Sequence, residues 1–278
     1  MLKMPSGKKV AVSISPDFDA QSAWIGGFGL KSPSYLSRGD FGADVGLPRV
    51  LDVFQRYDIK TTFFVPGHSM LTYPSQLEAI MNSGHEIASH GCYHEAIPTL
   101  TPERERELMI KQIGQYEKMV GNKPRGYRSP AWDYSDSTLA LLEEFGFDWD
   151  SSLMGRDLEP YRPRPVTVNL EEASVFGPYS KILEFPVSWF LDDWPPMEFI
   201  PGIAAGLGDH ELLFRRWKEI FDYARGLPNP SLYTLTVHPQ VIGRAHLIVI
   251  FEKLIKYIKS YDDVWFAPLS NFYDVWVD

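Results

Sequence analysis

Two short stretches of the sequence carry the residue types that could hold a metal ion and activate water. Asp17 and Asp19 follow an apolar segment at residues 9–15, and His90 and His94 stand in SHGCYHE. Two acids two apart share one face of a strand, and two histidines four apart share one face of a helical turn. Two histidines with one carboxylate are a frequent zinc set with a position open for water. The spacing therefore indicates a divalent metal site, with zinc expected, at the two histidines and one of the two acids.

A metal ligand at Asp19 would give its neighbour a different task. Asp17 would then lie near the metal-bound water without being tied to the ion, which suits a general base, because zinc lowers the pKa of its water to roughly 7. The alternative is structural, since acids after a strand often cap the next helix or close a turn. Cys92, between the two histidines, is expected to be a small buried residue, because no paired base is evident.

Further polar and aromatic residues follow other apolar runs. They are His68 in PGHS, Arg128 and Trp132 in RSPAW, Asp148 and Asp150 in FDWDSS, Asp192 and Asp193 after FPVSWFL, and His238 in LTVH. In a parallel barrel the active site lies at the carboxyl ends of the strands, so these residues are expected to gather. His68 by itself is typical of a loop histidine or a pocket wall. The aromatic cluster from Trp189 to Trp194 is by default core or interface, with pocket lining as the alternative.

The elements that must position these residues alternate in type along the chain. Short β-branched runs, such as residues 61–66 and 232–237, alternate with segments of helical period, such as 101–120. Thr101, Pro102 and Gly121 mark the start and end of that helix. Such alternation implies parallel βαβ units. We expect an α/β fold, a distorted (β/α)7 TIM-like barrel, as one domain over residues 1–278. A doubly wound sheet is the alternative, but no glycine-rich phosphate loop follows the first strand.

Two segments interrupt this alternation. Residues 26–46 and 156–179 are rich in Gly, Pro, Ser and charged residues. Loops of that length in a compact domain are usually lids or binding loops, and we expect both segments to be loops of that kind.

Composition excludes several classes of protein. The 278 residues include 27 Lys and Arg against 36 Asp and Glu, a net charge of −9, and 44% are hydrophobic. We therefore expect a packed core and neither a nucleic-acid nor a membrane partner, because those partners need clustered cations. A single cysteine excludes an internal disulfide, and neither a signal peptide nor an 18-residue apolar span is evident. These features predict a cytoplasmic protein.

With these motifs assembled, the chain resembles the polysaccharide deacetylase family, also called the NodB-homology group, over about residues 10–271. The motifs that carry the resemblance are SPDFDA, SHGCYH, RSPAW and LTVHP, in the family's order. The resemblance implies a metal-dependent amidohydrolase in which Asp17 is the general base. It also implies that Asp19, His90 and His94 bind zinc or a similar divalent ion, and that His238 protonates the leaving amine.

The resemblance implies roles for other residues as well. The arginine of the third motif, Arg128, would orient the base, and Trp132 would wall the substrate groove. An acid near the fifth strand would steady the late histidine, and Asp150 is our choice. We also assign His68 and Trp189 to the substrate-binding surface.

The chain departs from the family's common pattern. Phe18 separates two aspartates that are usually adjacent, and a long insert replaces the usual Gly-Pro turn. These features, with VPGHS and FPVSWFLDDWPPM, are similar to a branch that holds intracellular peptidoglycan-deacetylase-like proteins, cyclic imide hydrolases and a metal-free allantoinase. The branch implies a homotetramer, and the retained metal set argues against the metal-free variant.

Three functions remain open from the sequence. The first is deacetylation of N-acetylglucosamine units in a glycan. The second is ring opening of a cyclic imide or ureide, which fits a long loop able to close over a small pocket. The third is a non-catalytic carbohydrate-binding barrel, which would not need an acid and base pair. An open trough would favour the polymer, and a sealed cavity would favour the small ring.

Overall fold

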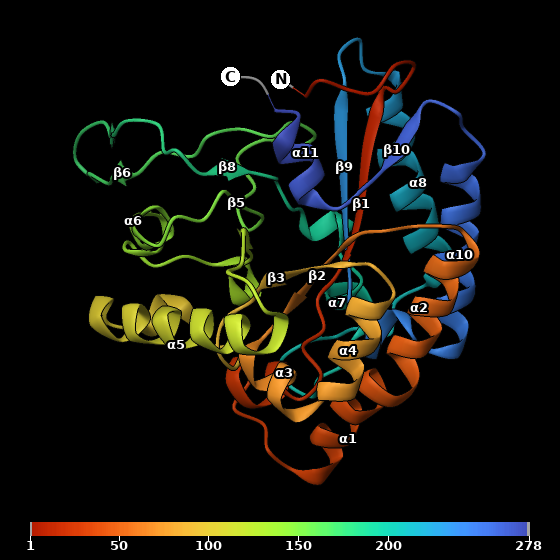
Figure 1. Cartoon of the computed structure of the whole chain (residues 1–278), viewed down its shortest axis with the longest axis horizontal. Helices are drawn as coiled ribbons and strands as arrows, with labels where there is room; N and C mark the ends of the chain where they lie inside the picture. Colours follow the sequence, from red (N-terminus) through yellow and green to blue (C-terminus); the bar gives the residue numbers. More distant parts are fainter. Residues whose placement is uncertain (1, 277–278) are drawn as a thin grey trace.

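The computed structural model describes residues 2–276, and all of its strands except a short antiparallel pair form two parallel sheets (Figure 1). The first sheet has the order β10-β1-β9 and the second has the order β2-β3-β4-β5-β8. Their bounds are β1 Val10–Pro16, β2 Thr62–Val65, β3 Glu86–Ser89, β4 Gly126–Tyr127, β5 Trp149–Asp150, β8 Leu183–Glu184, β9 Ser231–Val237 and β10 Val264–Phe266. The expectation of a parallel α/β fold is confirmed.

Single backbone bridges connect the two sheets on both sides. At the end of β1, Asp17 pairs with Phe64 of β2, and beyond β8, Asp192 pairs with Thr236 of β9, both in parallel. These bridges bring the carboxyl ends of β1, β2 and β9 together. They support the seven-stranded barrel expected from the sequence, and its closure stays a prediction.

Helices cover the outer faces of the sheets. Their bounds are α1 Pro33–Phe41, α2 Leu47–Arg56, α3 Gly67–Thr72, α4 Pro74–Asn82, α5 Pro102–Val120, α6 Thr138–Glu144, α7 Trp194–Met197, α8 His210–Gly226, α9 Pro239–Ile242, α10 Ala245–Lys259 and α11 Leu269–Asp274. The signals predicted for α5 are confirmed: the Thr101 hydroxyl accepts a hydrogen bond from the Arg104 N–H, and Gly121 ends the helix at φ 94°.

The main core lies between the β1–β9 pair and the helices α2, α8 and α10. Trp217, Phe221, Phe251, Phe54 and Tyr233 are all buried there. Burying each large aromatic side chain contributes on the order of 2–3 kcal/mol. This core fixes β1, the strand that leads directly into Asp17 and Asp19.

The structure corrects one loop expectation. Residues 26–46 were expected to be a long loop. They begin in the π-helical segment Ala23–Gly27 and go on to form α1 and the π-helical segment Gly42–Gly46. Close packing explains the glycines there, because a Cβ on Gly46 would lie 2.0 Å from the Pro239 carbonyl oxygen. The segment is therefore a packed helical element.

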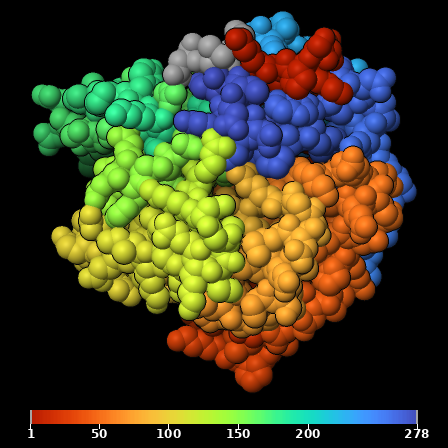
Figure 2. Space-filling model, viewed as in Figure 1, coloured from red at the N-terminus to blue at the C-terminus, as the bar shows by residue number. Residues whose placement is uncertain are grey.

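Residues 156–179 are mostly irregular, as expected. Only the short antiparallel pair β6 Val166–Thr167 and β7 Val175–Phe176 interrupts the segment, which projects from the body beside α6 (Figures 1 and 2). Leu2 pairs with Trp276, so both ends of the described chain lie on one side of the molecule (Figure 1). No helix within residues 2–276 is both long enough and apolar enough to cross a bilayer.

Candidate metal centre and active site

A small cavity of about 110 Å³ lies where the carboxyl ends of the strands meet. Its polar lining comes from Asp17 and Asp19 after β1, His90 and His94 after β3, and His238 after β9. Asp192 also lines it, with the aromatic and apolar residues Ala23, Phe28, Ala131, Trp132, Trp189 and Trp194. Residues that the sequence places up to 221 positions apart thus face one space.

Asp19, His90 and His94 form a compact group of ligand atoms. The Nε2 atom of His90 lies 3.4 Å from Asp19 Oδ1, and the Nε2 atom of His94 lies 3.9 Å from Asp19 Oδ2. All three residues are buried, and their ligand atoms lie within 4.8 Å of one another. This is the set that the sequence predicted.

The geometry that brings the two histidines together differs from the expected helical turn. After β3 the chain runs as an irregular loop, with Gly91 at φ 71° and His94 at φ 61°. The Glu95 carboxylate accepts hydrogen bonds from the N–H groups of Cys92 and Tyr93 and holds this loop in place. Non-glycine residues at positive φ are uncommon and need surroundings that impose them. The helical-turn prediction is therefore wrong, although the imidazole pair it predicted is present.

Three observations fit a divalent cation at this group. Both carboxylate oxygens of Asp19 are buried with no hydrogen-bond partner among the described residues, an arrangement that is costly unless something compensates it. His90 uses its Nδ1 for a 2.8 Å hydrogen bond with the Arg128 carbonyl oxygen, which leaves Nε2 facing Asp19. Burial lowers the pKa of His90, and it lowers that of His94 to about 4, so both imidazoles are neutral, as metal ligands must be.

A second acidic group beside the cavity already has its partners. Asp193 accepts hydrogen bonds from the His238 backbone N–H and from Nδ1 of its ring, the latter at 2.7 Å. Asp192 accepts a hydrogen bond from the Trp194 N–H. Although Asp192, Asp193 and His238 are close enough to hold an ion, these hydrogen bonds account for the acids without one. The group that fits a cation is therefore the one at Asp19.

Asp193, rather than Asp150, is the acid that contacts His238. Burial alone would lower the pKa of His238, but the charge and hydrogen bond of Asp193 outweigh it and raise that pKa to about 10. Our assignment of Asp150 to this role is wrong, because Asp150 pairs in register with Glu184 on β8 and accepts its hydrogen bond from Ser152. The sequence feature that points to Asp193 is the pair of acids in DDW, directly after the apolar run FPVSWFL.

Arg128 holds Asp17 from below the cavity. Its Nη1 donates to Asp17 Oδ1 at 2.6 Å, and both groups are buried. The Nε atom donates to the Ser151 carbonyl oxygen, and Nη2 donates to the hydroxyls of Ser15 and Ser151. The guanidinium also stacks 3.8 Å from the Phe64 ring centroid. Asp17 Oδ2 remains directed at the cavity, 3.9 Å from His238 Nε2.

Aromatic rings form the walls of the cavity. Trp132 and Trp189 lie with ring centroids 4.4 Å apart, and Phe28 stacks on Trp194 at 5.9 Å. Trp132 is nearly buried, whereas Trp189 is 45% exposed and forms the rim. The structure thus places Trp132 and Trp189 at the cavity as predicted. It adds Trp194, which the sequence assigned by default to core or interface, and Phe28, which the sequence analysis did not single out.

His68 does not belong to this site. It lies in α3, near the hydroxyls of Ser22 and Thr72, and it is not among the residues that line the cavity. The structure does not support its assignment to the substrate-binding surface, because its Nδ1 lies 3.4 Å from the Ser22 hydroxyl and 3.3 Å from the Thr72 hydroxyl, away from the cavity lining.

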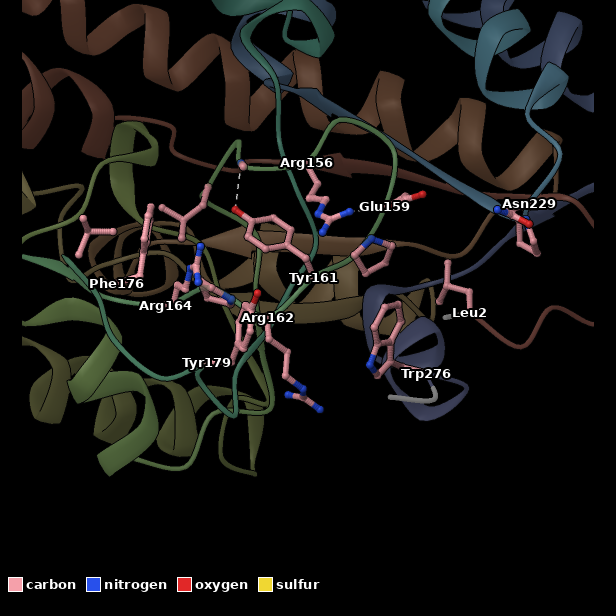
Figure 3. Close-up of a pocket in the computed structure, with 16 residues that line it drawn as sticks. Leu2, Arg156, Glu159, Tyr161, Arg162, Arg164, Phe176, Tyr179, Asn229 and Trp276 are labelled. Carbon is pink, nitrogen blue, oxygen red and sulfur yellow. Dashed lines mark hydrogen bonds and ion pairs between the residues drawn. The ribbon is translucent and has the colours of Figure 1, made fainter. Parts of the chain in front are cut away.

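A larger hollow of about 960 Å³ lies elsewhere on the molecule (Figure 3). Arg156, Tyr161, Arg164 and Tyr179 from the projecting segment line it together with Trp276 near the chain's end. None of the acids or histidines described above lines this hollow. Size alone would therefore mislead a search for the site of chemistry.

Comparison with known proteins gives an independent view of the chain. Residues 39–149 match the family model described as polysaccharide deacetylase. The peptidoglycan deacetylase of Helicobacter pylori is 32% identical, with 96% of each chain covered. A peptidoglycan deacetylase-like protein of Gibberella zeae is 33% identical, over 91% of this chain and 82% of that one.

Solved structures agree with the fold. A Mycobacterium smegmatis protein assigned to the polysaccharide deacetylases superposes with a TM-score of 0.85 at 31% identity, covering 98% of this chain and 92% of that one. The structure of Puue allantoinase superposes with a TM-score of 0.81 over the same shares, but at 23% identity it speaks for the fold alone.

Proposed function

We propose that this chain, which belongs to the polysaccharide deacetylase family and is a hydrolase of C–N bonds, removes the acetyl group from N-acetylglucosamine units of a glycan. The observation that carries this proposal is the meeting of three kinds of group around one cavity. These are a carboxylate held by an arginine, a histidine held by an acid, and the cation-binding set. A protein that only binds sugars would need neither the acid nor the base.

Asp19, His90 and His94 are the residues that would hold a divalent cation, for which zinc suits two imidazoles and one carboxylate. When bound, such an ion supplies Lewis-acid polarisation of the amide carbonyl and makes water acidic enough to be deprotonated near neutral pH.

The chain's own residues provide the proton transfers. Asp17 accepts the proton of the attacking water on Oδ2, because Arg128 occupies its other oxygen and keeps the carboxylate oriented. Water oxygen bonds to the carbonyl carbon, and the C–N bond then breaks as His238 donates a proton to nitrogen. Asp193 holds His238 Nδ1, so Nε2 is the atom that faces the cavity and delivers this proton. The products are acetate and a free amine.

The cavity suits an acetamido group with its sugar ring outside. Its volume of about 110 Å³ is below the roughly 150 Å³ of an apolar cavity that accommodates benzene. A whole sugar polymer cannot enter it, but the exposed face of Trp189 at the rim offers an apolar platform for the ring. We therefore place the N-acetyl group inside and the glycan across Trp189.

The aromatic walls also admit a second candidate, a cyclic imide or ureide. The reacting carbonyl of such a ring would lie in the cavity, with the rest of the ring against the Trp132–Trp189 pair and Phe28. The proton transfers by Asp17 and His238 would be unchanged, and a ring-opened amide would replace acetate and amine. The two candidates thus differ in substrate and share the machinery.

Proton NMR of one reaction tube separates them. Zinc-loaded protein is mixed with a chitin-type N-acetylglucosamine oligomer and succinimide, and both products are followed over time. Acetate at a rate well above that of the Asp17→Asn variant supports the proposal. Succinamate without acetate supports the second candidate and contradicts the glycan assignment. A protein that forms neither product while binding the oligomer would be the carbohydrate-binding barrel.

A further inference from the structure

We propose that Asp150 and Glu184 share one proton as a buried carboxyl–carboxylate pair, and that this pair positions Arg128 against Asp17 through residues 150–153. The inference rests on the proposed function only in that Asp17 is taken as the base. It gives a task to two acids that the chemistry at the cavity does not use.

The pair is built by strand register. Asp150 of β5 and Glu184 of β8 are direct partners in the parallel ladder, and both are fully buried. One oxygen of each acid has neutral donors: Asp150 Oδ1 accepts from the Ser152 hydroxyl, and Glu184 Oε1 accepts from the N–H groups of Ser152 and Leu153. Neither of these oxygens is bonded to a cation.

The other oxygens lack partners. Asp150 Oδ2, Glu184 Oε2 and the Tyr134 hydroxyl are buried with no hydrogen-bond partner among the described residues. Glu184 and Tyr134 are close enough to Asp150 to act on its carboxyl group. Asp150 and Glu184 could not both be ionised at these paired, buried positions, because like charges repel strongly in a medium of low dielectric. A proton on Glu184 removes the repulsion and supplies the missing donor.

Within residues 2–276, the ion pairs and hydrogen bonds of the two acids include no cation that could replace this proton. Tyr127, Tyr134 and Tyr161 are titratable neighbours of the pair, and burial raises the pKa of each, so all three are neutral near pH 7. The Arg128 guanidinium is directed at Asp17 and Ser151. Burial and the Asp150 charge together raise the pKa of Glu184 well above its usual range, in agreement with the geometry.

Hydrogen bonds lead from the pair to the base. The pair anchors Ser152, whose hydroxyl also accepts from the Ser129 N–H, and so fixes Ser151 between two held positions. Ser151 in turn accepts two hydrogen bonds from Arg128, at its carbonyl oxygen and at its hydroxyl. Arg128 then sets the direction of Asp17. Glu184 is thus a positioning residue that never touches substrate.

Linkage provides a test that does not depend on activity. In the folded protein the pair keeps one proton, whereas in the unfolded chain both acids are ionised above about pH 5. Through this pair the wild type binds one more proton when folded, so the contribution of the pair to stability falls as pH rises. Glu184→Gln imitates the protonated acid, since its amide oxygen can accept from residues 152 and 153 and its NH2 can donate to Asp150. From pH 5.5 to 7.5 the unfolding constant of the wild type, relative to Glu184→Gln, should rise about 100-fold, tenfold per pH unit.

The experiment is urea unfolding of the zinc-loaded full chain across that range. Glu78→Gln, the same change at an exposed helix position, is the matched control and should follow the wild type at every pH. Parallel curves for wild type and Glu184→Gln would overturn the shared proton. This result is independent of whether either substrate is hydrolysed, so it cannot be confused with failure of the proposed function.

The positioning role has its own test. Glu184→Leu removes the acceptors for residues 152 and 153, and kcat should fall about tenfold or more, with KM and bound zinc unchanged, because a small displacement of the base is costly. Glu184→Gln should restore most of that loss. Equal kcat in Glu184→Leu and wild type would overturn the positioning role. If Glu184→Leu does not fold, the comparison is made with Ser151→Ala, which removes only one hydrogen bond to Arg128. This variant should also lower kcat and leave KM and bound zinc unchanged.

Discussion

Replacing Arg128 by methionine should both destabilise the protein and disable the base. Methionine keeps an unbranched apolar stem of similar length but removes the guanidinium. Four hydrogen bonds disappear, to Asp17, to Ser15 and two to Ser151. The Asp17 carboxylate is then left in a buried position without its cation.

The size of the effect follows from burial. Arg128 is fully buried and Asp17 is 1% exposed, so water cannot replace the lost partner. Removing one member of a buried ion pair typically costs about 3–5 kcal/mol, because the remaining charge stays desolvated. A misdirected base should also lower kcat by about 100-fold or more.

Arg125 offers a matched control in the same stretch of chain. It also makes two ion pairs, with Asp148 at 2.6 Å and Asp274 at 2.8 Å, but its side chain is 41% exposed. Exposed pairs contribute about 0–1 kcal/mol each, so Arg125→Met should cost less than about 2 kcal/mol and leave kcat unchanged. Urea unfolding with and without EDTA measures both variants, and the EDTA series removes any contribution from metal binding.

An Arg128→Met protein as stable as Arg125→Met would contradict a buried ion pair between Arg128 and Asp17. That result would mean that Asp17 is neutral or solvated in the folded protein, contrary to its burial and its contact with the guanidinium. Normal stability with normal kcat would also remove Asp17 from the role of base.

Three further results are expected. Asp17→Asn should keep its bound zinc but lose at least about 100-fold in kcat, because the amide cannot accept the proton of water. Zinc analysis and NMR rates measure these two quantities, and a variant with wild-type activity would contradict the role of Asp17 as base. His94→Ala should lose stoichiometric zinc, whereas His68→Ala, outside the cavity, should retain it; unchanged zinc in the first variant would show a different ligand set. Burial against Phe54 and Phe63 lowers the pKa of His85 to about 4, so the wild type should lose about 1.4 kcal/mol of stability per pH unit relative to His85→Leu as pH falls from 6.5 to 4. In that window His85 is neutral in the folded protein and takes up a proton when the chain unfolds. Urea unfolding of His85→Leu should therefore lack this pH dependence of stability, and a pH dependence equal to that of the wild type would contradict a neutral, buried His85.

The sequence by itself determined which residue types stand at which strand ends. Alternating β and α segments predict parallel strands, and parallel strands have their carboxyl ends on one side. That argument alone brought Asp17, Asp19, His90, His94 and His238 to one cavity, where the structure has them. Local chemistry also predicted the limits of α5, because its cap residues act within one turn.

Helix content at the mouth required the tertiary structure. Residues 26–46 have the composition of a loop, yet contacts make them helical. Gly39 and Gly46 allow backbone to pack on Ala20 and Pro239, where any side chain would collide. Composition reports the glycines but not the neighbour that each one admits.

Only the tertiary structure decided which partners the acids have. Asp193 reaches His238 across 45 residues because Asp192 pairs with Thr236, whereas Asp150 meets Glu184 because β5 pairs with β8. Spacing along the chain fixes the side on which a residue ends, but pairing between strands fixes its neighbour. The acid that steadies the histidine and the acid pair beneath it therefore depend on strand register, which no local pattern in the sequence specifies.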